Sequence, residues 1–261
     1  MSINTSSSFM ESANEIRTTF GEDYSLLADF FEQFAAETDF TALEEIEKEF
    51  VTVSPGLLGD PALLKSDHQE RFLMLISWFV QKYRILHSLG LHNAAQTKVL
   101  DLGSGGGHFL ALAQFAGHDC LGLDQENPLF AKLCALLGVP RTVWEIEARS
   151  KLPDLGQFDL ITAQNIAFHK QEDSFWDDQD WLFFIKDVTE HLLAPAGQLL
   201  LHFKPDQVPE KGGLCIEDKS LPRFLRQLGA TFLEDNSGLE VTYFAIFNDP
   251  DRLRQKLMLF G

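Results

Sequence analysis

The chain has 261 residues, 45% of them hydrophobic, and a formal net charge of −18. A surface this acidic repels the phosphates of DNA and RNA, and no apolar run is long enough to span a membrane, so we expect neither nucleic acid nor a membrane as a partner. The three cysteines form no CxxC motif, which indicates neither a disulfide framework nor a metal site. The first residues lack the pattern of a secretion signal, and we expect a cytoplasmic protein.

The first 97 residues have helical periodicity. Apolar residues recur at intervals of three and four within 25–50 and again within 71–91, and TVSPGLLGDP at 52–61 separates the two stretches. We therefore expect residues 1–97 to form an N-terminal helical extension. Its apolar faces need a surface to pack on, and we expect a cap over the domain that follows, with packing on the flank of a sheet or a dimer interface as the alternatives.

From Lys98 onward, short apolar runs alternate with helical stretches. KVLDLG, CLGLD, TVWEIEA, FDLITA and QLLLHF predict strands, and FLALAQFAG, PLFAKLCALLG and WLFFIKDVTEHLL predict helices between them. Strands separated by helices form right-handed crossovers and a mostly parallel sheet covered on both faces. The last two runs, TFLE and VTYFAIF, leave no room for a helix, so they predict a hairpin with one antiparallel strand. The pattern is that of a doubly wound α/β fold.

The stretch KVLDLGSGGGHFLALA places a glycine turn between the first predicted strand and its helix. Gly103, Gly105 and Gly107 allow tight backbone dihedrals and close approach of a ligand. No Lys-Ser or Lys-Thr pair follows, as a phosphate-binding P-loop requires, and His108 stands where a dinucleotide fingerprint has its third glycine. Both phosphate-binding interpretations are weakened, so the flanking residues must decide.

Two acidic residues flank this turn. Asp101 lies just before the first glycine, and Asp124 ends the next predicted strand. A carboxylate at the tip of the second strand can accept hydrogen bonds from a ribose diol, which indicates an adenosine-type ligand. Asp101 would repel a pyrophosphate but attract an ammonium group. S-adenosylmethionine meets both conditions, because it carries adenosine, a sulfonium and an ammonium group and no phosphate.

With these residues in place, the sequence resembles the class I S-adenosylmethionine-dependent methyltransferases over residues 98–247. VLDLGSGGG is similar to their first motif, LGLD to the second, EARSKLPDLGQFDLITA to the third and fourth, and HLLAPAGQLLL to the helix-turn-strand that leads into the fifth strand. The resemblance implies S-adenosyl-L-methionine as the cofactor and a catalytic domain at residues 98–261. The predicted fold is a doubly wound, mostly parallel seven-stranded sheet with an antiparallel last strand, plus the N-terminal helical extension at residues 1–97.

The resemblance also implies the residues of a cofactor site. The active site lies over the glycine turn, Asp124 holds the ribose, and Glu147 with Ala148 contacts the adenine, where the family has an Asp-Ala pair. Glu147 is a mild departure from that pattern. The predicted cofactor-binding residues are Asp101, Gly103, Ser104, Gly105, Gly107, Asp124, Gln125, Glu147, Ala148 and Gln164.

The segment after the fourth predicted strand, AQNIAFHKQEDSFWDD, supplies the candidate catalytic residues Gln164, Asn165 and His169. Methyl transfer from a sulfonium is an in-line displacement, which depends mainly on positioning the acceptor. A base is needed only when the acceptor carries a proton. His169 is the first candidate because imidazole titrates near neutral pH, and His202 is the second.

This segment lacks the Asn/Asp-Pro-Pro-Tyr/Phe motif that the resembling DNA-amine and protein-glutamine methyltransferases carry there. Together with the acidity, this favours methyl transfer to a small-molecule acceptor, as in biosynthesis, by a monomer or homodimer. Two alternatives stay open. One is an enzyme that cyclises the aminobutyrate chain of S-adenosylmethionine and releases methylthioadenosine, and the other is an inactive partner protein that binds the cofactor.

Overall fold

The computed structural model describes residues 4–51, 69–171, 174–203, 220–235 and 242–260. They fall into two compact units: Met1–Gln96 with Gly105–Asp119 and Asn127–Pro140, and Thr97–Ser104 with Cys120–Glu126 and Arg141–Gly261. The predicted division into residues 1–97 and 98–261 is a different partition and stays a prediction. The segment at 52–61, which separates the two predicted helical stretches, lies outside the described residues.

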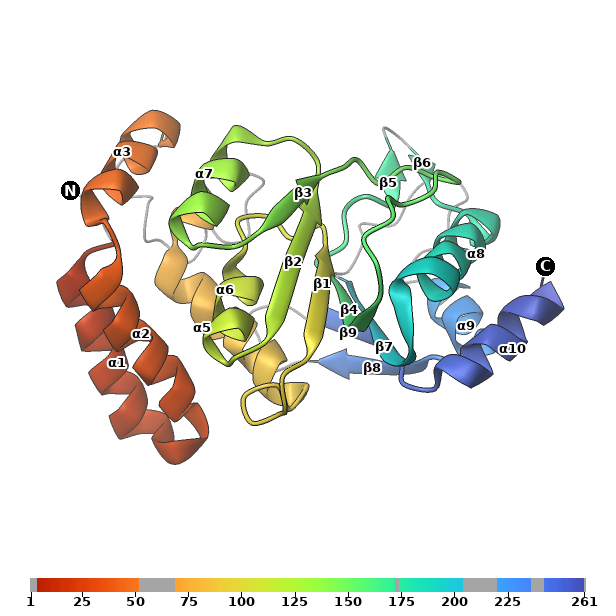
Figure 1. Cartoon of the computed structure of the whole chain (residues 1–261), viewed down its shortest axis with the longest axis horizontal. Helices are drawn as coiled ribbons and strands as arrows, with labels where there is room; N and C mark the ends of the chain where they lie inside the picture. Colours follow the sequence, from red (N-terminus) through yellow and green to blue (C-terminus); the bar gives the residue numbers. More distant parts are fainter. Residues whose placement is uncertain (1–3, 52–68, 172–173, 204–219, 236–241, 261) are drawn as a thin grey trace. The chain divides into compact units, whose positions relative to one another are not determined.

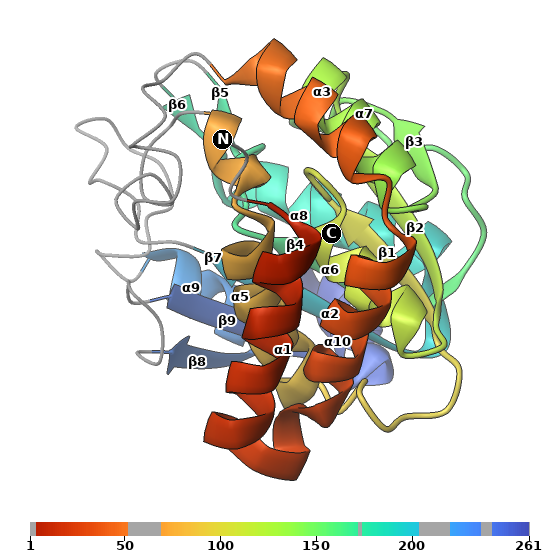
Figure 2. The same cartoon turned by 90° about the vertical axis from the view of Figure 1, so that its left-hand side faces the viewer.

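The first unit is helical. Its first helix begins at a capping box, in which Thr5 accepts a hydrogen bond from the Ser8 N–H and Ser8 accepts one from the Thr5 N–H. Figure 2 shows this helix, α1, lying beside α2. The helices are α1 (Ser6–Phe20), η1 (Gly21–Tyr24), α2 (Ser25–Glu37), α3 (Phe40–Phe50), η2 (Gln69–Leu73), α5 (Leu75–Ser88), α6 (His108–Phe115) and α7 (Pro128–Leu136).

Aromatic rings join the N-terminal helices of this unit to α6 and α7. Phe30 of α2 packs edge to face on Phe79 of α5 and on Phe115 of α6, at centroid distances of 4.7 and 5.4 Å. An ion pair between Lys132 of α7 and Glu49 of α3 adds a polar contact between these helices. The apolar face predicted for the N-terminal extension therefore packs on the helices that follow β1 and β2 along the chain.

The second unit is built on a seven-stranded sheet in the order β3-β2-β1-β4-β7-β9-β8, which can be followed in Figure 1. β4 pairs in parallel with β1 and β7, whereas β9 pairs antiparallel with β7 and β8. The predicted doubly wound, mostly parallel sheet with an antiparallel last strand is confirmed. The strands are β1 (Lys98–Leu102), β2 (Asp119–Asp124), β3 (Arg141–Val143), β4 (Phe158–Gln164), β7 (Leu193–Phe203), β8 (Thr231–Asp235) and β9 (Thr242–Phe247).

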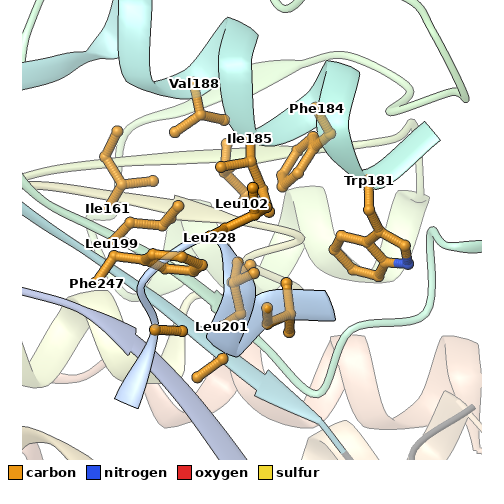
Figure 3. Packing of buried hydrophobic residues seen from close by; sticks show 14 of the residues in the cluster. Leu102, Ile161, Trp181, Phe184, Ile185, Val188, Leu199, Leu201, Leu228 and Phe247 are labelled. Carbon is orange, nitrogen blue, oxygen red and sulfur yellow. The ribbon is translucent and has the colours of Figure 1, made fainter. Parts of the chain in front are cut away.

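The main core of this unit lies between the sheet and α8. Phe184 and Ile185 of α8 face Ile161 of β4 and Leu199 of β7 (Figure 3), and all four are at most 4% exposed. Such burial is the main source of stability for the sheet. The remaining elements are the pair β5 (Lys170–Gln171) and β6 (Ser174–Phe175), α8 (Asp178–Asp187), the π-helical turn η3 (Val188–Leu192), α9 (Ser220–Gln227) and α10 (Pro250–Phe260). Within the described ranges, no helix has the length and apolarity to cross a membrane.

Candidate cofactor and acceptor site

The strand order reverses between β1 and β4. From β1 the chain builds outward through β2 and β3, and from β4 it builds in the other direction through β7. In open α/β sheets, ligands bind at such a reversal, beyond the carboxyl ends of the strands. The glycine turn follows β1, and the segment with Gln164, Asn165 and His169 follows β4, so both begin at this point of the sheet.

The first half of the glycine turn is fixed to β2. The N–H groups of Gly103 and Ser104 both donate to the carbonyl of Leu123, at 2.7 and 3.2 Å. Gly103 has a φ of +74°, in the region that favours glycine. The Ser104 hydroxyl is buried without a hydrogen-bond partner among the described residues. A buried hydroxyl of this kind is costly unless a ligand or water satisfies it.

Asp101 is held in place by the neighbouring strand. Its carboxylate is 2% exposed, and Oδ1 accepts a hydrogen bond of 2.6 Å from the hydroxyl of Thr162. The two residues are register partners in the β1·β4 pairing. A buried carboxylate therefore stands at the entrance of the turn, where it disfavours a phosphate and favours a cation.

The end of β2 carries the second predicted carboxylate. Asp124 Oδ1 accepts a hydrogen bond of 2.8 Å from the Gln125 N–H, and the Gln125 carbonyl accepts one of 2.8 Å from Arg141 of β3. The Asp124 carbonyl also accepts a bond of 2.9 Å from the N–H of Trp144, whose side chain is 39% exposed. Trp144 was not among the predicted site residues, although an aromatic residue directly after the third strand is a usable signal.

The segment after β3 is tied to α8. Glu147 is exposed and Ala148 is half-buried, and the next residue, Arg149, has a φ of +56°. Its guanidinium pairs with Asp180 at 2.7 Å and with Asp177 at 3.4 Å. Hydrogen bonds from the backbone N–H groups of Asp180 and Gln179 and the charge of Arg149 lower the pKa of Asp177. The predicted adenine-contacting pair is thus anchored by an ion-pair network.

Gln164 and Asn165 lie at the end of β4. Gln164 is 5% exposed and is the register partner of His202 on β7. Asn165 has a φ of +53°, an uncommon conformation for a residue other than glycine. The next N–H, that of Ile166, donates to the His202 carbonyl at 3.1 Å. The first turn of this segment is therefore fixed to β7, and strain at Asn165 is of the kind that occurs at functional positions.

His169 lies in an aromatic enclosure. It is 2% exposed, and its ring centroid is 5.3 Å from that of Phe175 and 5.8 Å from that of Trp181. His202, the second candidate base, is stacked on Phe244 at 4.3 Å. Neither imidazole stands in an open cleft. An acceptor would have to enter the enclosure to reach His169.

Phe168 connects this enclosure to the glycine turn. A Cβ placed on Gly103 would lie 3.9 Å from the ring of Phe168, and that ring packs on Trp176 and Phe184 at about the same centroid distance, 5.4 and 5.3 Å. The indole N–H of Trp176 is buried with no partner in the part of the chain that the structure describes, as is that of Trp181. Aromatic faces with unsatisfied donors therefore adjoin the turn.

The other two predicted glycines belong to the helical unit. Gly105 and Gly107 have φ values of +56° and +80°, and Gly107 is the residue before α6. The other predicted site residues all belong to the second unit: Asp101, Gly103, Ser104, Asp124, Gln125, Glu147, Ala148, Gln164, Asn165 and His169. No group of three His, Cys, Asp or Glu side chains suited to a metal ion occurs among the described residues.

No family model matches the sequence, and no curated protein matches it significantly. Similar solved structures include the N-methyltransferase NodS from Bradyrhizobium japonicum WM9 (TM-score 0.48, 16% identity, 67% of this chain and 97% of that one). Others are the PH0226 protein from Pyrococcus horikoshii OT3 (0.47, 17%, 65% and 90%) and a TehB-like SAM-dependent methyltransferase from Corynebacterium glutamicum ATCC 13032 (0.42, 18%, 69% and 97%). All three scores are below 0.5, and the function proposed below depends on strand order and side chains instead.

Proposed function

We propose that this chain, whose doubly wound sheet with an antiparallel last strand is the class I methyltransferase fold, binds S-adenosylmethionine and transfers its methyl group to a small-molecule acceptor. One observation carries the proposal. Two carboxylates lie at the carboxyl ends of neighbouring strands, before and after a glycine turn that contains no lysine: Asp101 is the penultimate residue of β1, and Asp124 is the last residue of β2. This arrangement suits an adenosine with a cationic tail and disfavours a phosphate.

The residues present fit this cofactor. Asp124 offers carboxylate oxygens to the ribose hydroxyls, and a carboxylate can accept several hydrogen bonds at once. The buried Ser104 hydroxyl has no partner among the described residues and can donate to a ligand oxygen. Trp144 is partly exposed, and its backbone N–H binds the Asp124 carbonyl, so its ring is our candidate stacking surface for the adenine, with Glu147 and Ala148 as candidate contacts at the edge of the adenine.

When bound, S-adenosylmethionine supplies an electrophilic methyl group on a positively charged sulfur. The work of the chain is then to orient an acceptor and exclude water. The rings of Phe168 and Trp176 provide an apolar wall beside Gly103, and such rings also stabilise a sulfonium by cation–π attraction. Gln164 and Asn165 offer amide groups that can orient the acceptor, and His169 is the proposed acceptor of its proton.

A small-molecule acceptor fits the surface and the enclosure. A net charge of −18 disfavours nucleic acid, and the segment after β4 carries no Pro-Pro motif. The enclosure around Phe168 and Trp181 is aromatic, with indole N–H donors that need an acceptor oxygen or nitrogen. These features support a compact molecule with an apolar or aromatic body and at least one hydrogen-bond acceptor.

The experiment is an incubation with S-adenosylmethionine labelled in its methyl group, together with separate small-molecule, protein and nucleic-acid fractions of a cell extract. We expect label in the small-molecule fraction, formation of S-adenosylhomocysteine, and neither with the Asp124→Ala variant. Label in protein or nucleic acid would contradict the acceptor class. Release of methylthioadenosine from the cofactor alone would replace methyl transfer with cyclisation of the aminobutyrate chain.

A further inference from the structure

The short helix η2 is held by hydrogen bonds to its carbonyl groups from two other helices of the same unit. The indole N–H of Trp78, on α5, donates to the Arg71 carbonyl at 2.8 Å. His108 Nε2, on the first residue of α6, lies 3.0 Å from the Phe72 carbonyl. Since a carbonyl only accepts, the imidazole carries its proton on Nε2 and donates. The segment before α5 is thereby fixed to the residue that follows the glycine turn.

The Phe72 ring contacts two segments that follow strands of the sheet along the chain. It stacks on Trp78 at a centroid distance of 5.3 Å and an angle of 9°, which fixes its plane. Its neighbours on the strand-following segments are Phe130 of α7, edge to face at 4.7 Å, and Gly105 of the glycine turn, where an added Cβ would lie 3.6 Å from the ring. Phe72 thus bridges the turn after β1 and the helix that follows Gln125 and Glu126.

We propose that Phe72 is a positioning residue for the glycine turn, supplied by the N-terminal region, and that it sets the affinity for the cofactor. The inference rests on the proposed function. Gly105 has a φ of +56° and no side chain, and its carbonyl accepts a weak bond from Cys134 Sγ at 3.6 Å. Any remaining freedom of the turn costs conformational entropy when a ligand binds. A ring fixed against it removes part of that cost before binding, which is preorganisation.

This role has a reciprocal consequence. If the ordered turn favours the ligand, then the ligand must favour the ordered arrangement of η2 by the same factor. S-adenosylhomocysteine should therefore slow amide hydrogen exchange in residues 69–75 of the wild-type protein. A ring that only fills space in the helical unit would not respond to the ligand.

The test compares Phe72→Ala with Phe115→Ala in the full-length protein. Phe115 is also a half-buried ring that joins the N-terminal helices to α6, through Phe30, but it lies at the opposite end of α6 from the turn. Calorimetry with S-adenosylhomocysteine gives the affinity, and thermal unfolding gives the stability. We expect both variants to lower the melting temperature, Phe72→Ala alone to raise Kd, by about tenfold, and Phe72→Tyr to restore the affinity.

The outcomes separate the two proposals. Wild-type protein that binds no S-adenosylhomocysteine overturns the proposed function, and this inference with it. Wild-type binding together with equal affinity in Phe72→Ala and Phe115→Ala overturns this inference alone. If Phe72→Ala does not fold, the exchange experiment on wild-type protein decides. Slower exchange in residues 69–75 on binding supports the positioning role, and unchanged exchange there overturns it.

Discussion

Asp124 is the residue on which recognition of the ribose depends. Asp124→Ala removes the charged acceptor of two expected hydrogen bonds, which costs roughly 2 to 4 kcal/mol. The affinities for S-adenosylmethionine and S-adenosylhomocysteine should fall by a similar factor, because both molecules carry the same ribose. Calorimetry measures both affinities. Asp119→Ala, an exposed carboxylate at the other end of β2, is the matched control and should bind like wild type. Unchanged affinity in Asp124→Ala would remove this residue from the site.

His169 tests the chemical step rather than binding. With an acceptor identified by the labelling experiment, His169→Ala should lower kcat by about 10² to 10⁴ and leave the cofactor Kd nearly unchanged, because a positioned base acts on the acceptor. His169→Gln keeps a polar side chain in the aromatic enclosure but cannot act as a base. Its kcat should therefore be as low as that of His169→Ala, while its melting temperature should be closer to that of the wild type. A fall in rate of less than about threefold in both variants would make His169 a packing residue.

For single residues, the sequence indicated which residue types belong to the candidate site, but it did not indicate which contacts hold their side chains in place. Asp101 and Asp124 are readable from motif spacing, since Asp101 comes two residues before the glycine turn and Asp124 ends the next apolar run. That Thr162 binds the Asp101 carboxylate depends on the register between β1 and β4, which no local pattern specifies. The burial of His169 was not predictable for the same reason, because its ring neighbours come from β6, α8 and β7.

Among the elements, the segment after β3 is held to the first turn of α8 by Arg149. Arg149→Ala should free Glu147 and Ala148 and raise the Kd for S-adenosylhomocysteine about two- to fivefold. Because the ion pairs are exposed, about 1 M salt should bring the wild-type affinity close to that of the variant. Lys48→Ala, which breaks an exposed ion pair with Glu44 within α3, is the control. Equal salt dependence in wild type and Arg149→Ala would contradict this role.

The elements themselves were largely readable from apolar periodicity. Apart from β3, the strands of the sheet lie where the pattern placed them, as do the pairing of β8 with β9 and the helices α6, α7 and α8. The run TVWEIEA predicts a longer strand than β3, which ends at Val143, the register partner of Asp124, where β2 also ends. The helix α10 was not predicted, and it buries Leu253 and Leu257, which lie four residues apart on one face.

For the whole molecule, the buried His108 makes stability depend on pH. Burial, and secondarily the charge of Lys82, lowers its pKa from 6.5 to about 3. Between these values the unfolded chain binds a proton that the folded chain does not, so stability is full above pH 6.5 and is lost as pH falls toward 3. Protonation linked to this imidazole should lower the free energy of unfolding by about 3 kcal/mol between about pH 7 and pH 4.

Urea unfolding at both pH values, for wild type and His108→Gln, measures that contribution. The glutamine variant is less stable at neutral pH, but it should lose less stability on acidification, because the imidazole that resists protonation is gone. The carboxylates titrate alike in both proteins and cancel in the comparison. An identical loss in the two proteins would contradict a buried, neutral His108.

The place of the N-terminal helices was the least predictable feature at this scale. Periodicity shows that residues 25–50 and 71–91 have apolar faces, but it carries no information about what covers them. In the structure, α2 and α5 share an aromatic core with α6, through contacts such as Phe30 with Phe115. That the N-terminal helices also cap the acceptor site stays a prediction.

The central claim is that the glycine turn and its two carboxylates hold a sulfonium cofactor rather than a phosphate-bearing one. Calorimetric titration of the wild-type protein with S-adenosylmethionine and, separately, with NADH tests this directly. We predict one molecule of S-adenosylmethionine bound per chain, and weak or undetectable binding of NADH, because Asp101 repels a pyrophosphate at the turn. Tighter binding of NADH than of S-adenosylmethionine would contradict the account.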